Sequence, residues 1–263
     1  MCGIAGYSLS PNARLPRTLA AQALLAGIAE RGNDAVGYTH RGRGVASTTT
    51  IKQRTGASKL LERIHVPDAA TQLLVHVRDY TKGHPSVPAN NHPVRHGAVV
   101  GIHNGIIVND EDVLADFPCA RVEARMSVDS EAIFALAAHS NGDAGAFEQL
   151  NGSMATAWLD ERVVDTVFLA RGIGRPLWLG TSSAGVFFAS TRRALEVFEA
   201  YVRVKLRKRE VADGTLLELR DGEVVRRARF TPQPFVEDDP LPGVRAPREA
   251  EACLSVLQSL AAA

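Results

Sequence analysis

The first residues of the chain carry its clearest chemical signal. Cys2 directly follows the initiator methionine, so removal of Met1 exposes a thiol and a free α-amine on one residue. The thiol is a nucleophile, and an α-amine with a reference pKa of about 7.7–8.0 can act as its base near neutral pH. The stretch that follows, residues 3–7, combines apolar side chains with glycines that admit close backbone contacts, which is typical of a buried strand. An N-terminal cysteine nucleophile is therefore one interpretation, and a small buried hydrophobic residue is the other.

Two later positions could orient a substrate through its charges. Arg78 ends an apolar run, and an arginine there can clamp a carboxylate through two parallel hydrogen bonds. Asp129 falls in the first turn of an expected helix, where its carboxylate could bind an ammonium group. The structural alternatives are an ordinary ion pair for Arg78 and complementation of the helix dipole for Asp129.

The dipeptide Asn104-Gly105 follows another apolar run. A side-chain amide and a backbone N–H that are adjacent in sequence can both point at a developing oxyanion. The alternative is a tight turn, for which Asn-Gly is a favoured pair. Residue types alone leave both interpretations open.

A cluster of histidines raises the question of a metal site. Five of the eight histidines fall between residues 76 and 103. Their spacings match no tight ligand pattern, and no acidic companion stands out, so we expect no bound metal. The five are His76, His84, His92, His96 and His103.

The composition excludes several classes of function. The chain has 263 residues, of which 45% are hydrophobic and 22% charged, and its 30 basic and 29 acidic side chains give a net charge of +1. This near-neutral balance does not indicate the excess of positive charge that is typical of proteins that bind nucleic acid or an anionic membrane. No apolar run of about 18 residues suggests a membrane span, and the N-terminus does not resemble a signal peptide. Three widely spaced cysteines, Cys2, Cys119 and Cys253, form no disulfide framework, which favours a reducing cytoplasm.

The elements that must position these residues can be read from hydrophobic periodicity. Helices and strands come in blocks and not in strict βαβ order, which favours an α+β fold with mostly antiparallel sheets. The expected helices cover residues 17–31, 57–66, 110–115, 144–150 and 191–199, and a further helix begins with a cap at Ser127. The expected strands cover residues 3–7, 35–38, 44–47, 72–78, 98–103, 153–159, 164–170, 176–179, 185–189, 209–211, 214–219 and 223–230. Gly32 should cap the first helix, and the strand at 98–103 should stop at the Asn-Gly pair.

The composition changes after Thr231. We expect one domain over residues 1–230, a proline-rich linker over 231–247 and an amphipathic helix over 248–263. The apolar face of that helix should consist of Ala250, Leu254, Leu257 and Leu260. This face could dock a partner or a second copy, or it could pack on the chain's own domain.

Taken in order, these segments resemble the class II glutamine amidotransferase domains of the N-terminal nucleophile hydrolase superfamily. The matching motifs are residues 2–6 (CGIAG), 31–37 (RGNDAVG), 76–78 (HVR) with Thr81 and Gly83, 91–93 (NHP), 103–109 (HNGIIVN) and 127–131 (SVDSE). The resemblance extends over about residues 2–225, and the specificity comes from the motif order because each motif alone is weak. It implies a four-layer αββα sandwich.

The resemblance also implies a role for each matching residue. Cys2 would be the nucleophile and its α-amine the base, while Asn104 and the backbone N–H of Gly105 would form the oxyanion hole. Arg78 would bind the α-carboxylate of L-glutamine, and Asp129 its α-ammonium group. Thr81 would help to position the substrate, and Arg31 would support the loop around Cys2. Neither a metal nor an organic cofactor is implied.

Two departures from the family pattern leave the substrate open. Asp79-Tyr80 stands where the family often has Trp-Ala, and Lys82 stands where it often has His. An amidase for another γ-glutamyl or small amide is therefore an alternative to a glutaminase, and a non-catalytic assembly subunit is a third hypothesis. Because no synthase domain is recognisable after residue 230, we expect a separate synthase subunit to accept the ammonia. Assembly of the chain into a homo-oligomer stays open.

Overall fold

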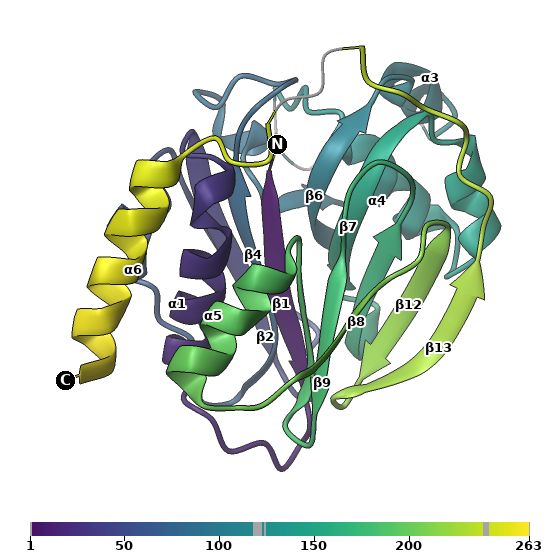
Figure 1. The fold of residues 1–263 in the computed structure, drawn as a ribbon. Coiled ribbons are helices and arrows are strands. Elements are labelled where there is room, and N and C mark those ends of the chain that lie inside the picture. Colours follow the sequence, from purple (N-terminus) through teal and green to yellow (C-terminus); the bar gives the residue numbers. More distant parts are fainter. Residues whose placement is uncertain (1, 118–122, 124, 239–241, 263) are drawn as a thin grey trace.

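Two antiparallel sheets form the centre of the molecule. The computed structural model describes residues 2–117, 123, 125–238 and 242–262 (Figure 1). Cys119 therefore lies outside the described residues. One sheet has the strand order β11 (Arg207–Glu210), β9 (Trp178–Ser182), β10 (Gly185–Ala189), β1 (Gly3–Leu9), β4 (Ala70–Arg78), β2 (Ala35–Gly42) and β3 (Thr49–Gln53). The other has the order β13 (Glu223–Arg229), β12 (Thr215–Arg220), β8 (Val163–Arg171), β7 (Gly152–Asp160), β6 (Val99–Ile107) and β5 (Val94–His96).

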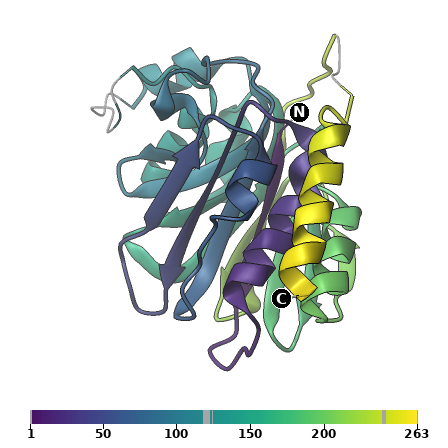
Figure 2. The same ribbon diagram turned by 90° about the vertical axis from the view of Figure 1, so that its left-hand side faces the viewer.

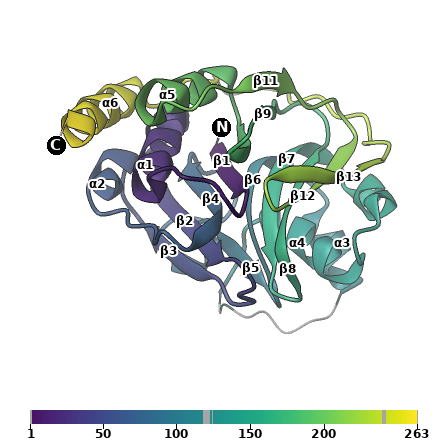
Figure 3. The ribbon, with the colours of Figure 1, turned by 90° about the horizontal axis from the view of Figure 1, so that it is seen from below.

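Helices cover the outer face of each sheet (Figure 3). The first sheet is covered by α1 (Arg17–Ile28), α2 (Ala57–Leu61), α5 (Arg192–Val202) and α6 (Pro247–Ala262), and the short 3-10 helix η1 (Ala29–Arg31) extends α1. The second is covered by α3 (Asp110–Ala115), α4 (Ser130–His139) and the 3-10 helix η3 (Ala144–Gln149), while another 3-10 helix, η2 (Pro88–Asn90), lies in the loop before β5. The layer order is helix, sheet, sheet, helix. The predicted four-layer αββα sandwich is confirmed.

Strand β1 shows why this sequence builds the layers. It lies between β10 and β4, and all of its residues are buried. Because side chains alternate across a strand, Ala5 and Tyr7 join the core under the helices while Ile4 joins the core between the sheets. A strand with apolar residues on both faces suits a position that is covered from both sides.

Strand β6 departs from the sequence prediction in a way that affects the site. It does not stop at Asn104-Gly105 but pairs with β7 as far as Ile107, opposite Gly152. Gly105 has a φ of +150°, and a Cβ on it would lie 1.9 Å from the backbone oxygen of Ser153. The predicted turn is wrong, and glycine is required there by close strand packing.

Several other predicted boundaries are wrong for local reasons. The strand expected at 44–47 is absent, because Gly44 turns the chain at a φ of +69° and the partner of β2 begins later, at Thr49. Ser127 does not cap α4, which begins at Ser130, because its hydroxyl bonds to Asn90 instead. The helix expected at 57–66 ends at Leu61, and the strand expected at 176–179 is Trp178–Ser182.

Gly32 follows the first helix as expected but does not act as a left-handed cap. Its backbone is extended, with a φ of 178°. A Cβ on Gly32 would lie 2.5 Å from the backbone oxygen of Arg78. Glycine therefore lets the chain after η1 approach the end of β4, and this approach brings η1 close to the start of β1.

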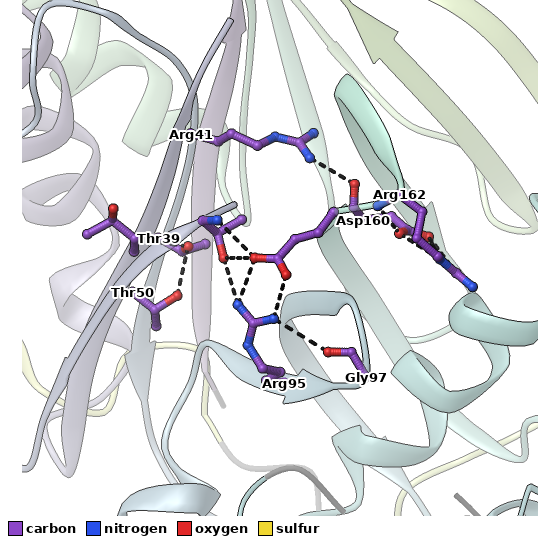
Figure 4. Close-up of polar contacts among 10 residues, drawn as sticks. Thr39, Arg41, Thr50, Arg95, Gly97, Asp160 and Arg162 are labelled. Atoms are coloured by element: carbon purple, nitrogen blue, oxygen red, sulfur yellow. Dashed lines mark hydrogen bonds and ion pairs between the residues drawn. The ribbon is translucent and has the colours of Figure 1, made fainter. Parts of the chain in front are cut away.

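A buried arginine joins the two sheets at the end of the sandwich opposite to Arg78. The Arg41 guanidinium donates to the Asp160 carbonyl at 2.8 Å (Figure 4). It also donates to Gln72 Oε1 at 2.8 Å and to the Thr166 carbonyl at 3.0 Å. Nearby, Arg95 and Glu161 of the second sheet form an ion pair of 2.8 Å, and both contact Thr48, just before β3 of the first sheet, at 2.9 Å. Because one guanidinium supplies several donors in a fixed plane, Arg41 sets the spacing between strands of both sheets.

The C-terminal helix α6 packs on its own chain. It lies beside α1 (Figure 2) and also contacts α2. Cys253 and Leu257 are fully buried in the core under the helices, whereas Leu260, one of the four residues predicted for the apolar face, is 37% exposed. The packing alternative is thus the one observed for this helix. No helix within the described ranges is long and apolar enough to cross a membrane.

Candidate active site

Cys2 lies at the start of the central strand, in the space between the sheets. The pairing of Gly3 with Val77 sets the register of β1 on β4, and one further step along it places Cys2 beside Arg78. Alternation gives the Cys2 side chain the same face as Ile4, toward the second sheet. The thiol lies 3.5 Å from the Asp79 carbonyl. Burial raises the pKa of the Cys2 thiol, so the thiolate requires a base.

The backbone around Cys2 is held from two sides. Arg31 Nε donates to the Cys2 carbonyl at 3.4 Å. Ile4 N–H donates to Ser190 Oγ at 2.8 Å, and Ser190 N–H donates back to the Ile4 carbonyl at 2.8 Å. A Cβ on Gly3 would lie 2.9 Å from Ile28, so glycine lets α1 pack directly against this part of β1. The N-terminal segment is therefore fixed where most chain ends fray.

Arg78 is buried at the end of β4 and shapes the loop that follows. Its Nη1 donates to Asn91 Oδ1 at 2.7 Å, and its Nη2 donates to the carbonyls of Lys82 (2.9 Å) and Gly83. The guanidinium thus ties residues 79–83 against the site. In this structure its described partners belong to the chain, and binding of a substrate carboxylate requires an exchange of partners or use of the remaining donors.

Asn104 is the unusual polar group of the site. It is completely buried, and neither its amide nitrogen nor its amide oxygen has a hydrogen-bond partner among the described residues. Buried polar side chains are nearly always paired, so an unpaired one indicates a ligand or a catalytic role. Alternation along β6 gives Asn104 the same face as Ile102, toward the first sheet. The next residue, Gly105, lines the cavity that contains Cys2.

Three buried histidines form a network behind the site, which the sequence analysis did not predict. His103 Nδ1 lies 2.9 Å from Ser130 Oγ, and His92 Nε2 lies 3.0 Å from the same oxygen. His76 stacks on His92 with ring centroids 4.2 Å apart. Burial lowers the pKa values of His76 and His103 to about 3, so both rings are neutral. Across the described ranges, no three His, Cys, Asp or Glu side chains are arranged to hold a metal ion.

Asp129 lies just before α4, next to Ser130, which contacts His92 and His103. Its Oδ2 accepts the Ile107 backbone N–H at 2.8 Å, and burial raises its pKa to about 6.

The residues that depart from the family pattern form ion pairs at the surface of the site. The Lys82 ammonium pairs with Asp110 at 2.8 Å and with Glu111 at 3.4 Å. Lys82, one of the departures from the family pattern, therefore fastens the loop to the start of α3. Asp79, which belongs to the other departure, forms an ion pair with Arg245, whose Nε lies 3.1 Å from Asp79 Oδ2.

Two cavities meet at Cys2. The smaller has a volume of about 10 Å³, room for about one water, and its walls include Arg78, Thr81 and Asp129. The larger has a volume of about 290 Å³. Its walls are Cys2, Asp79, Thr81, Gly105, Ile106, Val108, Arg175, Phe235, Val236, Glu237 and Asp238. A third cavity, of about 330 Å³ around Trp158 and Asp160, shares no lining residue with these two cavities.

Most of the predicted site residues therefore lie in one place. Cys2, Arg78, Thr81, Gly105 and Asp129 line the smaller cavity. Arg31 contacts the backbone of Cys2 from behind, and Asn104 lies next to Gly105 on β6. The sequence analysis missed Arg175 and Glu237, which line the larger cavity; Glu237 lies in the linker, where composition predicts only extended chain.

The fold and the position of Cys2 define a class of protein. A cysteine at the start of the central strand of an αββα sandwich, between the two sheets, is the arrangement of an N-terminal nucleophile hydrolase. Two solved structures share the fold. Glutamine phosphoribosylpyrophosphate amidotransferase from B. subtilis has a TM-score of 0.66 at 18% identity, and a structure described as the allosteric regulatory enzyme of purine biosynthesis has 0.65 at 20%. Each alignment covers 87% of this chain and 49% of the other.

Sequence comparison narrows the class to a family. The profile of the glutamine amidotransferase domain matches residues 83–197. Glutamine–fructose-6-phosphate aminotransferase of Shouchella clausii is 26% identical over 254 residues, which cover 90% of this chain and 40% of that protein. The enzyme of the same name from Escherichia coli K12 is 30% identical over 209 residues, covering 74% and 32%. The chain belongs to the class II glutamine amidotransferase domains, and it spans less than half the length of these relatives.

Proposed function

We propose that this chain hydrolyses the side-chain amide of L-glutamine through a thioester on Cys2 and releases glutamate and ammonia. The observation that carries the proposal is the buried amide of Asn104, which has no partner in the described part of the chain and lies next to Gly105 in the cavity of Cys2. A donor that lacks a partner in the free protein is available to an oxyanion that forms during the reaction.

The chemistry follows from what each group can donate or accept. Once Met1 is removed, the α-amine of Cys2 takes the thiol proton, and Sγ attacks the amide carbon of glutamine. The oxyanion accepts hydrogen bonds from Asn104 Nδ2 and the backbone N–H of Gly105. The amide nitrogen then receives a proton from the α-ammonium group and leaves as ammonia. Water activated by the same amine cleaves the thioester and releases glutamate.

Recognition of glutamine uses the charges that surround the smaller cavity. Arg78 would bind the α-carboxylate, Asp129 the α-ammonium group, and Thr81 would help to position the substrate between them. Because this cavity holds about one water, entry of glutamine requires residues 79–83 to move outward. Arg31 would hold the backbone of Cys2 in place during the reaction.

The fate of the ammonia is the second part of the proposal. The names of the relatives describe transfer to fructose 6-phosphate in one case and an amidotransferase of phosphoribosylpyrophosphate in the other. By analogy, we propose that ammonia passes to an acceptor site on a synthase that assembles with this domain. Release of ammonia into water would waste it, since the free molecule diffuses away and is protonated at neutral pH.

The test compares the wild-type protein with two cysteine variants. Wild type, Cys2→Ala and the matched control Cys253→Ala are assayed for glutamate release from glutamine and treated with a glutamine analogue that bears an electrophilic side chain. Cys253 is completely buried, and burial raises its pKa to about 12, so its thiol should not react. We expect activity in wild type and Cys253→Ala, none in Cys2→Ala, and one adduct on a Met1-free Cys2 peptide. Hydrolysis that survives Cys2→Ala would refute the thioester, and an unreactive wild type that retains Met1 would indicate a non-catalytic subunit.

A further inference from the structure

We propose that Arg175 and Ser153 form an anion subsite on the leaving-group side of Cys2, and that Glu237 of the same chain fills it in the free protein. The ligand would be a γ-glutamyl amide whose amine part carries a carboxylate, such as a γ-glutamyl amino acid. This inference rests on the proposed function, because Cys2 must cleave the γ-glutamyl bond.

The subsite consists of two side chains that are almost completely buried. Arg175, in the loop between β8 and β9, is 8% exposed, and Ser153 on β7 is 1% exposed. Arg175 Nη2 donates to Glu237 Oε1, and Ser153 Oγ donates to the same oxygen at 2.7 Å. Gly174, at a φ of +74°, places its Cα against the Ser153 side chain, where a Cβ would be 3.1 Å away. The arginine and the hydroxyl are thus held close together before any ligand arrives.

The position of the subsite matches the leaving-group side of the reaction. Arg175 lies in the wall of the 290 Å³ cavity together with Cys2 and Gly105, whereas Arg78 and Asp129 lie in the wall of the smaller cavity. A substrate with its α-carboxylate and α-ammonium groups in the smaller cavity has its amide carbon at Cys2. The group on the amide nitrogen then points into the larger cavity, whose volume is at the lower end of the range for small-molecule pockets.

Glu237 behaves as a replaceable occupant. It belongs to the linker after β13, outside any helix or strand, and its neighbour Val236 is 87% exposed. Between residues 234 and 244, the hydrogen bonds of Glu237 are the polar contacts that attach the described part of the linker to the body of the domain. Its Oε1 takes both bonds, and Arg175 Nε has no partner among the described residues. A free carboxylate could therefore bind the guanidinium through two donors, where Glu237 uses one.

The energetics require an anion at Arg175. A buried guanidinium left without a counter-charge is costly, so displacement of Glu237 is favourable only for a ligand that brings its own negative group. Ammonia from glutamine brings none and leaves Glu237 in place. For a γ-glutamyl amino acid, Sγ bonds to the γ-carbonyl carbon, the C–N bond breaks, and the nitrogen takes a proton from the α-amine of Cys2. The amino acid leaves, and water cleaves the thioester to give glutamate.

The experiment measures binding without turnover. In a Cys2→Ala background, calorimetry compares γ-glutamylglycine with its neutral isostere γ-glutamylglycinamide. We expect Glu237→Gln, which removes the internal competitor, to raise the affinity for γ-glutamylglycine about tenfold or more and to change that for the amide less than about twofold. The matched control Asp238→Asn, an exposed acid in the same cavity wall, should change neither. Arg175→Gln should abolish the preference for the charged ligand, and Arg175→Lys should retain part of it.

The outcomes separate this inference from the proposed function. If Glu237→Gln changes the affinity for both ligands alike, or if neither ligand binds, the subsite is refuted and Glu237 is a fastening of the linker. Hydrolysis of glutamine by the wild-type protein is measured separately. Glutamine hydrolysis without a charge preference leaves the proposed function intact and removes the subsite. A charge preference in binding without any hydrolysis supports the subsite and refutes the proposed function.

Discussion

His76 Nε2 lies 3.0 Å from the backbone oxygen of His103 and links β4 of one sheet to β6 of the other. Since a carbonyl can only accept, Nε2 carries the proton of the neutral ring. Burial lowers the pKa of His76 to about 3, so the ring is neutral near pH 7 and donates through Nε2. The bond holds β6, one residue before Asn104, against β4, which pairs with β1 beside Cys2.

Removal of the Asn104 amide should slow the chemical step. We expect Asn104→Ala to lower kcat for glutamine by about 10²–10³ and to leave KM within about threefold, because the amide would act on the oxyanion and not on the bound substrate. Steady-state kinetics checks this, with Asn12→Ala, an exposed asparagine, as the control. A large rise in KM with an unchanged kcat would instead assign Asn104 to substrate binding.

The raised pKa of Asp129 predicts an acid limit for glutamine use. Burial raises this pKa to about 6, so the carboxylate is lost to protonation as the pH falls below that value. We expect kcat/KM to fall with decreasing pH through this region, because a neutral carboxyl no longer binds the α-ammonium group. Asp129→Asn should have a low kcat/KM at neutral pH, and its pH profile from about 4.5 to 8 should lack the fall at acid pH. A fall that persists in the variant belongs to another group.

The ion pair between Lys82 and Asp110 should restrict entry of glutamine. The smaller cavity has a volume of only about 10 Å³ in this structure, and this ion pair of 2.8 Å fastens the loop that lines it. We expect the double variant Lys82→Met/Asp110→Asn, which leaves no buried charge unpaired, to lower KM for glutamine by roughly 1.5- to 5-fold, the range of a partly exposed ion pair. Glu111→Gln is the control, because Glu111 is 88% exposed. An unchanged KM in the double variant would show that the loop opens without breaking this pair.

Arg41 should be needed for stability and not for chemistry. Its partners are carbonyl groups of the second sheet and Gln72, and its removal leaves these acceptors buried without donors. We expect Arg41→Met to lower the free energy of unfolding by about 3 kcal/mol or more, measured by urea denaturation. Arg43→Met, at an exposed ion pair with Asp221, should change it by less than about 0.5 kcal/mol. Equal effects of the two substitutions would contradict a clamping role for Arg41.

Helix α6 should stabilise the domain through one face. Leu257 is completely buried in the core under the helices, where α6 contacts α1 and α2, so Leu257→Ala leaves a cavity and should cost about 2–4 kcal/mol. Leu260 is 37% exposed, and Leu260→Ala should cost less than about 1 kcal/mol. Thermal and urea unfolding of both variants tests this. A neutral Leu257→Ala would mean that the helix does not stay on the domain in solution.

The sequence by itself determined the class of fold and most of the elements. Period-two alternation and apolar runs predicted β1, β4, β7, β8 and β10, because strand patterning is a local property that survives without knowledge of partners. The block order of strands and helices predicted an α+β fold with mostly antiparallel sheets, whereas the layer order with helices outside was implied by the resemblance to the amidotransferase family. The order of short motifs indicated which residues belong to one site, because a motif contains residue types that the chemistry requires. Five of them line the smaller cavity in the structure: Cys2, Arg78, Thr81, Gly105 and Asp129.

Tertiary structure alone decided the features that depend on distant partners. Asn104-Gly105 is typical of a turn in isolation, but pairing with β7 keeps it in a strand, where the Asn104 amide has no partner among the residues that the structure describes. Arg78 reads as a free clamp, but the loop that follows supplies carbonyl partners for it. Arg175 and Glu237 are 62 residues apart in sequence and meet beside Cys2 because the chain after β13 runs to the end of the sandwich where β1 begins (Figure 1). No local pattern encodes such a meeting, since burial and charge pairing across layers depend on how the whole chain is packed.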